Sequence, residues 1–231
     1  MLAIIKKEMK KYFLSPVGYV VIAIFMLVFN IFFIMTTVNN GKVDLGNLYY
    51  YVSMIGLIFI VPVLTMRLFS EERKQGTEQL LLTSPISIIK IILAKFISAS
   101  LVIVVTLVIS LIYYLILCFF GTPNFELTML QIIGFLLVSM GSIAFGMFIS
   151  SLTENQIISA LITILYLAGM FYLMSKMGAT LKIIPLFYLP VFYMRSASGI
   201  IAMSDILVLL LYTITFITLT WIVMKRRKLV R

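Results

Sequence analysis

The sequence predicts an all-α integral membrane protein, and three observations support this fold class. Of its 231 residues, 63% are hydrophobic and only 11% are charged, whereas soluble domains are roughly half apolar and about a quarter charged. The apolar residues gather in six long runs, each sufficient for a helix to cross a hydrocarbon core of roughly 30 Å. Most basic residues lie next to alternate ends of these runs, as in membrane proteins of fixed orientation. A water-soluble globule is therefore excluded.

The six apolar runs are the predicted transmembrane helices. They cover about residues 16–37, 48–69, 87–120, 128–150, 156–175 and 204–224. The first should begin at Ser15-Pro16 and the third at Ser84-Pro85, because serine at the N-cap followed by proline starts a helix. The third run is longer than a bilayer requires, so we expect it to tilt or to project from the membrane.

The chain is expected to form a single membrane domain over residues 1–231. It would comprise an interfacial helix at 1–14, the six-span bundle at 16–224 and a basic cytoplasmic tail at 225–231. No internal repeat or low-complexity tract divides it.

The basic residues predict that both termini lie in the cytoplasm. Of the 18 lysines and arginines, four would lie on the outer side: Lys42, Lys176, Lys182 and Arg195. The others would lie on the inner side: Lys6, Lys7, Lys10, Lys11, Arg67, Arg73, Lys74, Lys90, Lys95, Lys225, Arg226, Arg227, Lys228 and Arg231. Cytoplasmic segments carry an excess of Lys and Arg. This N-in/C-in arrangement accounts for the net charge of +10 without a nucleic-acid partner.

The first fourteen residues have an amphipathic pattern. On a helical wheel one side holds Leu2, Ile5, Met9, Tyr12 and Phe13, and the opposite side holds most of Lys6, Lys7, Lys10 and Lys11. Such a helix lies in the membrane interface against anionic lipid. The alternative is an ordinary basic flank of the first span.

The outer segment 175–203 is the longest predicted stretch that does not span the membrane. It contains "IIPLFYLPVFY" at 183–193, which is too apolar for a solvated loop. We expect short helices that dip into the outer leaflet or close over a cavity. A broken seventh span is the alternative, since prolines interrupt the run.

Two features inside the spans concern helix packing. Ser142, Gly146 and Ser150 recur every four residues on the fourth span, and small residues at this spacing let helices approach closely. They would pack either within the bundle or against a second copy of the chain. Pro62 should kink the second span, and this kink is either static or part of a mechanism.

The sequence does not support catalysis, metal binding, nucleotide binding or ion coupling by this chain itself. There is no histidine and a single cysteine, which argues against a Ser-His dyad and a metal centre. Gly41-Lys42 lacks the rest of a phosphate-binding loop. No span has a charge near its middle, whereas ion-coupled carriers keep ionisable groups there, and Lys95 and its neighbours near the inner ends can snorkel. We therefore expect no catalytic residue, metal or cofactor in this chain.

The charged segment between the second and third spans is the predicted contact with a partner. Ser70–Lys74 can extend the second span as helix, and Gly76 allows the helix to stop. Thr77 suits an N-cap and Glu78 a first helical turn, so Gln79–Leu82 would form a short cytoplasmic helix. Such a helix fits a groove on a soluble protein. A solvated turn that merely obeys membrane topology is the alternative.

The sequence "RLFSEERKQGTEQLLLTSPIS" at 67–87 resembles the signature of the membrane subunit of type 2 ABC exporters. Further segments agree with this family. "FISSLTENQIISA" at 148–160 resembles its second inner turn, "SGIIAMSDIL" at 198–207 resembles the approach to its last span, and the basic start resembles its elbow helix. Within the family the chain is most similar to the gliding-motility and copper-accessory type permeases.

The resemblance implies a permease subunit of an ATP-driven exporter in the plasma membrane, a bacterial inner membrane. Two permease chains, identical or different, would form the translocation path, and a separate ABC-type ATPase would bind ATP and Mg²⁺. Gly76–Leu82 would be the coupling helix, and the turn at 151–156 a second contact. The implied contact residues are Glu71, Glu72, Gly76, Thr77, Glu78, Leu80, Leu81, Leu82, Pro85, Thr153 and Glu154. The cargo is left open.

Two other function classes remain as alternatives. An ion-coupled membrane carrier would need charged residues that line a span. A non-transporting membrane scaffold or immunity protein would need no ATPase partner.

Overall fold

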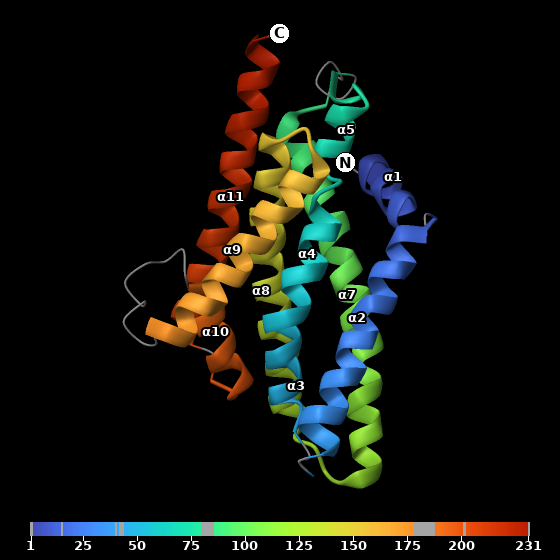
Figure 1. Ribbon diagram of the computed structural model, residues 1–231, viewed down its shortest axis with the longest axis vertical. Helices are drawn as coiled ribbons and strands as arrows, with labels where there is room; N and C mark the ends of the chain where they lie inside the picture. Colours follow the sequence, from blue (N-terminus) through green and yellow to red (C-terminus); the bar gives the residue numbers. More distant parts are fainter. Residues whose placement is uncertain are drawn as a thin grey trace.

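The computed structural model is a bundle of long helices that run roughly along one axis (Figure 1). It describes residues 2–14, 16–39, 41, 44–79, 86–177, 188–200 and 202–230. Within these residues six helical stretches are long and apolar enough to cross a membrane: Gly18–Val38, Gly46–Lys74, Ile88–Phe120, Phe125–Leu152, Gln156–Leu173 and Met203–Lys228. They correspond one by one to the six predicted runs, so the all-α, six-span fold is confirmed.

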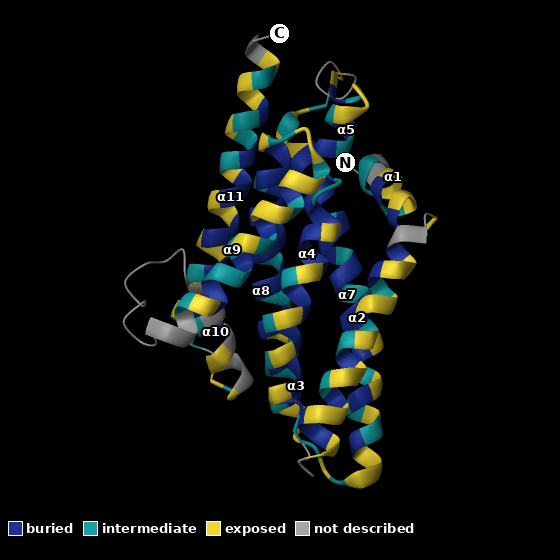
Figure 2. Cartoon of the chain, in the orientation of Figure 1, coloured by how far each residue is buried: buried dark blue, intermediate teal, exposed yellow. Residues whose placement is uncertain are grey.

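The α-helices and two π-helical turns follow one another along the chain. The α-helices are α1 (Leu2–Phe13), α2 (Pro16–Phe33), α3 (Gly46–Tyr51), α4 (Leu57–Thr65), α5 (Ser70–Lys74), α7 (Ile88–Phe120), α8 (Phe125–Leu152), α9 (Gln156–Met177), α10 (Tyr188–Ala197) and α11 (Met203–Val230), and the π-helical turns are η1 (Ile34–Val38) and η2 (Val52–Gly56). Apolar side chains cover the outward faces and fill the interior, where α8 has a larger buried share than the other spans (Figure 2).

The two predicted Ser-Pro helix starts have different outcomes. The first span begins at Pro16, as predicted. The third does not start at Ser84-Pro85, which lie outside the described residues, because Ser87 has extended backbone with φ −65° and ψ 139°. A helix cannot continue through an extended residue, so α7 begins only at Ile88 with Ser87 at its N-cap.

The second span is less regular than the sequence suggests. The π-helical turn η2 separates α3 from α4, which no local sequence pattern indicated. A π-helical turn forms where one extra residue is inserted into a turn of an α-helix. Pro62 lies buried inside α4, and the predicted kink at this proline stays a prediction.

α8 is the central helix of the bundle, and its small residues face other helices of the same chain. A Cβ atom added at Gly146 would collide with the Thr65 side chain of α4. Gly141 faces Leu189 of α10 and Tyr212 of α11. Packing within the bundle therefore accounts for the stripe that contains Gly146, and this face of α8 is already covered.

Both termini lie toward the same end of the bundle, at the top of Figure 1. This end also carries α5 and the turn between α8 and α9, and we call it the basic end. Helix α1 forms over the predicted residues and packs against α7 and α2. Its lysines at 6, 7, 10 and 11 are exposed, whereas Tyr12 is buried and donates a hydrogen bond to the Leu64 carbonyl at 3.0 Å.

The segment 175–203, which the sequence predicts to lie on the outer side, contains one helix outside the spans among its described residues, α10. α10 packs along α8 beside the start of α11 (Figure 1), as expected for a short helix in this segment. Residues 178–187 lie outside the described part. Arg195 near the end of α10 pairs with buried Asp205 in the first turn of α11 at 3.0 Å, which fastens the two helices together.

Candidate functional site

The candidate site lies at the basic end, where three parts of the chain meet. Ser150, near the end of α8, holds the break between α4 and α5. Its hydroxyl accepts hydrogen bonds from the backbone N–H groups of Phe69 at 3.1 Å and Ser70 at 3.2 Å. The Ser70 hydroxyl in turn donates to the Ser150 carbonyl at 3.1 Å. The start of α5 is thus fixed to the end of the central helix.

A glycine ends α5, as the sequence predicts. Gly76 has φ +71°, a left-handed conformation that favours glycine. Thr77, however, donates its hydroxyl hydrogen backward to the Glu72 carbonyl at 3.2 Å, so it closes α5. Of the predicted coupling helix Gly76–Leu82, residues 76–79 are described, whereas Leu80, Leu81 and Leu82 lie outside the described part, as does the predicted contact residue Pro85.

Four charged side chains join the three parts of the basic end. We call them the Arg73 network, which consists of Arg73, Glu78, Glu154 and Arg227. Arg73 Nε lies 2.9 Å from Glu154 Oε1 and 3.7 Å from Glu78 Oε2. Arg227 Nη1 lies 3.2 Å from Glu78 Oε1. Arg73 Nε lacks hydrogen-bond alignment in these pairs, so its attraction to both carboxylates is ionic.

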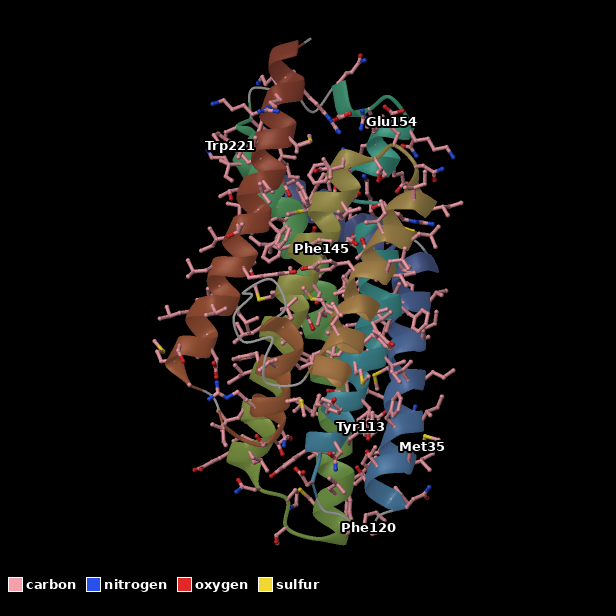
Figure 3. The ribbon with its side chains drawn as sticks, turned by 60° about the vertical axis from the view of Figure 1, so that its left-hand side comes forward. Met35, Tyr113, Phe120, Phe145, Glu154 and Trp221 are labelled. Carbon is pink, nitrogen blue, oxygen red and sulfur yellow. The ribbon has the colours of Figure 1, made fainter. Side chains whose placement is uncertain are left out.

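The same two arginines also bind the end of α8. Arg73 and Arg227 donate to the Leu152 carbonyl at 3.3 and 3.4 Å. Carbonyls at a helix C-terminus lack intrahelical partners and carry partial negative charge, which favours cations there. The network therefore ties α5, the α8–α9 turn and the last turns of α11 into one unit. In Figure 3 Glu154 marks this end, opposite Phe120 and Met35.

A second group of charges lies deeper in the same end. We call it the Lys95 cluster, which consists of Glu8, Lys11, Glu72 and Lys95. Lys95 Nζ lies 2.8 Å from Glu72 Oε1 and 3.3 Å from Glu8 Oε1, and it donates to the Leu68 carbonyl at 2.6 Å. Lys11 Nζ lies 3.5 Å from Glu72 and 3.6 Å from Glu8.

Lys95 does not snorkel toward water, which corrects the expectation from sequence. Only 1% of its surface is exposed. Two carboxylates and a backbone carbonyl supply the partners that water would otherwise provide. The cluster connects α1 to α5 and α7, and Glu8, which sequence reasoning overlooked, is buried in it.

The predicted contact residues divide into a surface set and an internal set. Glu72 and Glu78 are both 4% exposed and point at partners within the chain. Glu71, Gly76, Thr77, Thr153 and Glu154 retain more surface. The surface set is thus accessible to a partner, whereas Glu72 and Glu78 are engaged within the chain.

Tyr12 completes the connection of α1 to the bundle. Burial raises the pKa of its phenol above the ordinary value, and the nearby carboxylates of Glu8 and Glu71 raise it further. The hydroxyl therefore stays protonated and donates to the Leu64 carbonyl.

Six membrane-length helices among the described residues, with charged networks gathered at one end, define a multi-pass membrane protein. A family model described as ABC-2 family transporter protein matches residues 28–222. Because the match covers most of the chain, the protein belongs to the ABC-2 transporter family and is a permease component of an ABC transporter. The resemblance of residues 67–87 to this family is thereby confirmed. A search of curated proteins found no match to the chain.

Proposed function

We propose that this chain is the permease subunit of an ATP-driven exporter and that its basic end couples it to a separate ABC-type ATPase. The Arg73 network carries the proposal. It joins the two segments that the family resemblance designates as ATPase contacts, α5 with its following turn and the α8–α9 turn, and adds the end of α11. Displacement of either segment by the ATPase would therefore move the other segment through these ion pairs.

The connections behind the contact surface give such a push a route into the membrane. α5 is hydrogen-bonded to α8 through Ser150, and α8 is packed against α4, α7, α9, α10 and α11. Displacement of α5 would therefore move the central helix with it. Closure of the ATPase on ATP and Mg²⁺, both bound by the partner, would switch the spans between inward- and outward-open arrangements.

The proposal also assigns an orientation and an assembly. The basic end would face the cytoplasm, since cytoplasmic segments are rich in Lys and Arg. Two permease chains would pair around the translocation path in the plasma membrane. Helix α1 would lie along the inner membrane surface, with its exposed lysines toward anionic lipid headgroups.

Two glycines provide a matched test of coupling. Gly76 at the basic end and Gly41 at the opposite end both have positive φ, 71° and 61°, with no atom within 4 Å of an added Cβ. Valine at either position introduces a similar backbone strain, on the order of 1–2 kcal/mol. We expect Gly76→Val to reduce co-purification of the ATPase and cargo-stimulated ATP hydrolysis severalfold, and Gly41→Val to leave both unchanged. Equal effects of the two substitutions would contradict the proposal.

An ion-coupled carrier is the second candidate, and the buried Lys95 cluster is the observation that favours it. Ionisable groups inside membrane proteins commonly carry coupling ions. The cluster, however, lies at one end of the bundle, and each of its carboxylates is paired with lysine. Purification from native membranes distinguishes the candidates. An ATPase in near-equal amount supports the exporter, and an intact dimer without ATPase supports a carrier or a scaffold.

A further inference from the structure

A cavity of about 340 Å³ with several charged lining residues lies between α1 and the α4–α5 break. Its charged lining consists of Glu8, Lys11, Arg67 and Glu71. The volume is near the lower limit of small-molecule sites, which span roughly 300–1,000 Å³. The cavity shares Glu8 and Lys11 with the Lys95 cluster and Glu71 with the predicted ATPase contacts.

The lining contains both a hydrogen-bond donor and a hydrogen-bond acceptor that can form further bonds. Arg67 Nε is buried and has no hydrogen-bond partner among the described residues, although a guanidinium offers five donors in a planar fork. Glu71 accepts a long hydrogen bond of 3.4 Å from Gln75, and a carboxylate accepts about four. The cavity therefore presents a donor fork and an acceptor that can each take more.

The balance of charge selects the chemistry of the occupant. The lining is formally neutral: Lys11 and Glu8 pair with each other and with the Lys95 cluster, which leaves Arg67 and Glu71 as the cation and the carboxylate offered to an occupant. A pure anion would meet the carboxylates, and a pure cation would meet the lysine and arginine. A zwitterion with a phosphate and an amine satisfies both, since arginine pairs with phosphate in a bidentate manner and carboxylates accept from ammonium.

A primary ammonium fits better than a quaternary one. Quaternary ammonium groups cannot donate hydrogen bonds and are recognised by cages of aromatic rings. Tyr12 is the aromatic residue that lines this cavity, and its hydroxyl is already bonded to Leu64. The carboxylate of Glu71, which accepts one long hydrogen bond, can instead accept hydrogen bonds from the N–H groups of a primary ammonium.

We propose that this cavity binds the phosphoethanolamine headgroup of a membrane lipid. Glycerophosphoethanolamine in solution shares the chemistry, but the position of the cavity favours the lipid. One wall is α1, an amphipathic helix whose lysines are exposed and whose next residue, Leu14, has 78% of its surface exposed. Such a helix lies at the depth of phospholipid headgroups. The lipid would connect α1 to the end of the second span and so tune how firmly the α4–α5 break is held.

Lipid retention by the purified full-length chain tests the proposal. The chain is reconstituted with equal amounts of phosphatidylethanolamine, its mono-, di- and trimethylated forms and phosphatidylglycerol, and retained lipids are identified by native mass spectrometry. We expect retention to fall stepwise with methylation, with at least a severalfold difference between the ends of the series. Glu71→Gln should abolish the preference, because it removes the acceptor for the ammonium, whereas Arg67→Gln, which removes the partner of the phosphate, should lower retention of the whole series. Lys7→Gln, a matched loss of charge at an exposed position of α1, should preserve both retention and preference.

Four outcomes would overturn the proposal. Equal retention of all headgroups would show ordinary lipid contact, and preference for phosphatidylglycerol would show a general basic surface. Competition by soluble glycerophosphoethanolamine at similar concentration would assign the cavity to a soluble zwitterion. Release of the lipid on addition of the ATPase would assign it to a protein contact. The methylation series with the unmodified chain decides the matter even if Arg67→Gln does not fold, and none of these outcomes depends on export activity.

Discussion

The Lys95 cluster and the Arg73 network are both groups of ion pairs at the basic end, but they differ in burial. In the cluster Lys95 has 1% of its side chain exposed and Glu8 and Glu72 have 5%, whereas Lys11 at its edge has 45%. In the network Glu78 has 6% exposed, Arg73 and Arg227 have 22% and 21%, and Glu154 has 66%. Removing one partner of a buried pair is costly, whereas exposed pairs contribute little. The cluster is therefore suited to fix structure and the network to rearrange.

Two consecutive residues of α5 separate these roles. Glu72 points into the cluster and Arg73 into the network. The short helix thus has one side fastened to α1 and α7 and another side that faces the α8–α9 turn and α11. If the network exchanges partners when an ATPase binds, the cluster gives that exchange a firm base.

The largest expected effect is that of Lys95→Met. The substitution leaves the half-exposed Lys11 as the remaining shared cation of buried Glu8 and Glu72, so the free energy of unfolding should fall by up to about 3–5 kcal/mol, the cost of breaking a buried pair. Equilibrium unfolding in detergent measures it. Lys90→Met, an exposed lysine of the same helix, is the control and should change little. A loss for Lys95→Met no greater than that for Lys90→Met would show that the cluster does not fix structure.

Ser150→Ala should have the next largest effect, because Ser150 joins α8 to the segment that bears both groups. Its removal leaves the N–H groups of Phe69 and Ser70 buried without an acceptor, at a cost of roughly 1–3 kcal/mol. Ser142→Ala on the same helix is the control, since the Ser142 hydroxyl donates only to the Val138 carbonyl of its own helix. Thermal unfolding of the two variants tests the difference. Equal shifts would separate the α4–α5 break from α8.

The sequence predicts local features of this end better than its contacts. The six apolar runs predict the spans because burial in lipid requires them, and Gly76 predicts the end of α5. The partners of the charges were not predictable by the same means. Glu78 and Arg227 are 149 positions apart, and Lys95 and Glu8 are 87 apart. From sequence alone, a basic residue near a span indicates only membrane topology, although Lys95 and Arg227 also form ion pairs with specific carboxylates.

Glu78 and Arg227 allow the network to be tested as a pair. Arg227→Gln and Glu78→Gln should each lower stability by about 1 kcal/mol or less, and the double variant should lose less than the sum, because the pair is removed once. If the network transmits motion, the rate of cargo-stimulated ATP hydrolysis should fall severalfold even though the free energy of unfolding changes little. Arg226→Gln, an exposed neighbour on α11, is the control. Strict additivity of the two losses would show that the pair is uncoupled.

The smallest expected change in stability is that of Glu154→Gln, and it separates the two roles most clearly. The Glu154 side chain is 66% exposed, so its pair with Arg73 contributes only a few tenths of a kcal/mol and is screened by salt. Stability should scarcely change, yet release of Arg73 from the α8–α9 turn should weaken coupling to the ATPase. High salt should reproduce the uncoupling in the unmodified chain and add nothing to Glu154→Gln. If salt uncouples both equally, the sensitive contact lies elsewhere, and the network, like the Lys95 cluster, would serve structure rather than exchange.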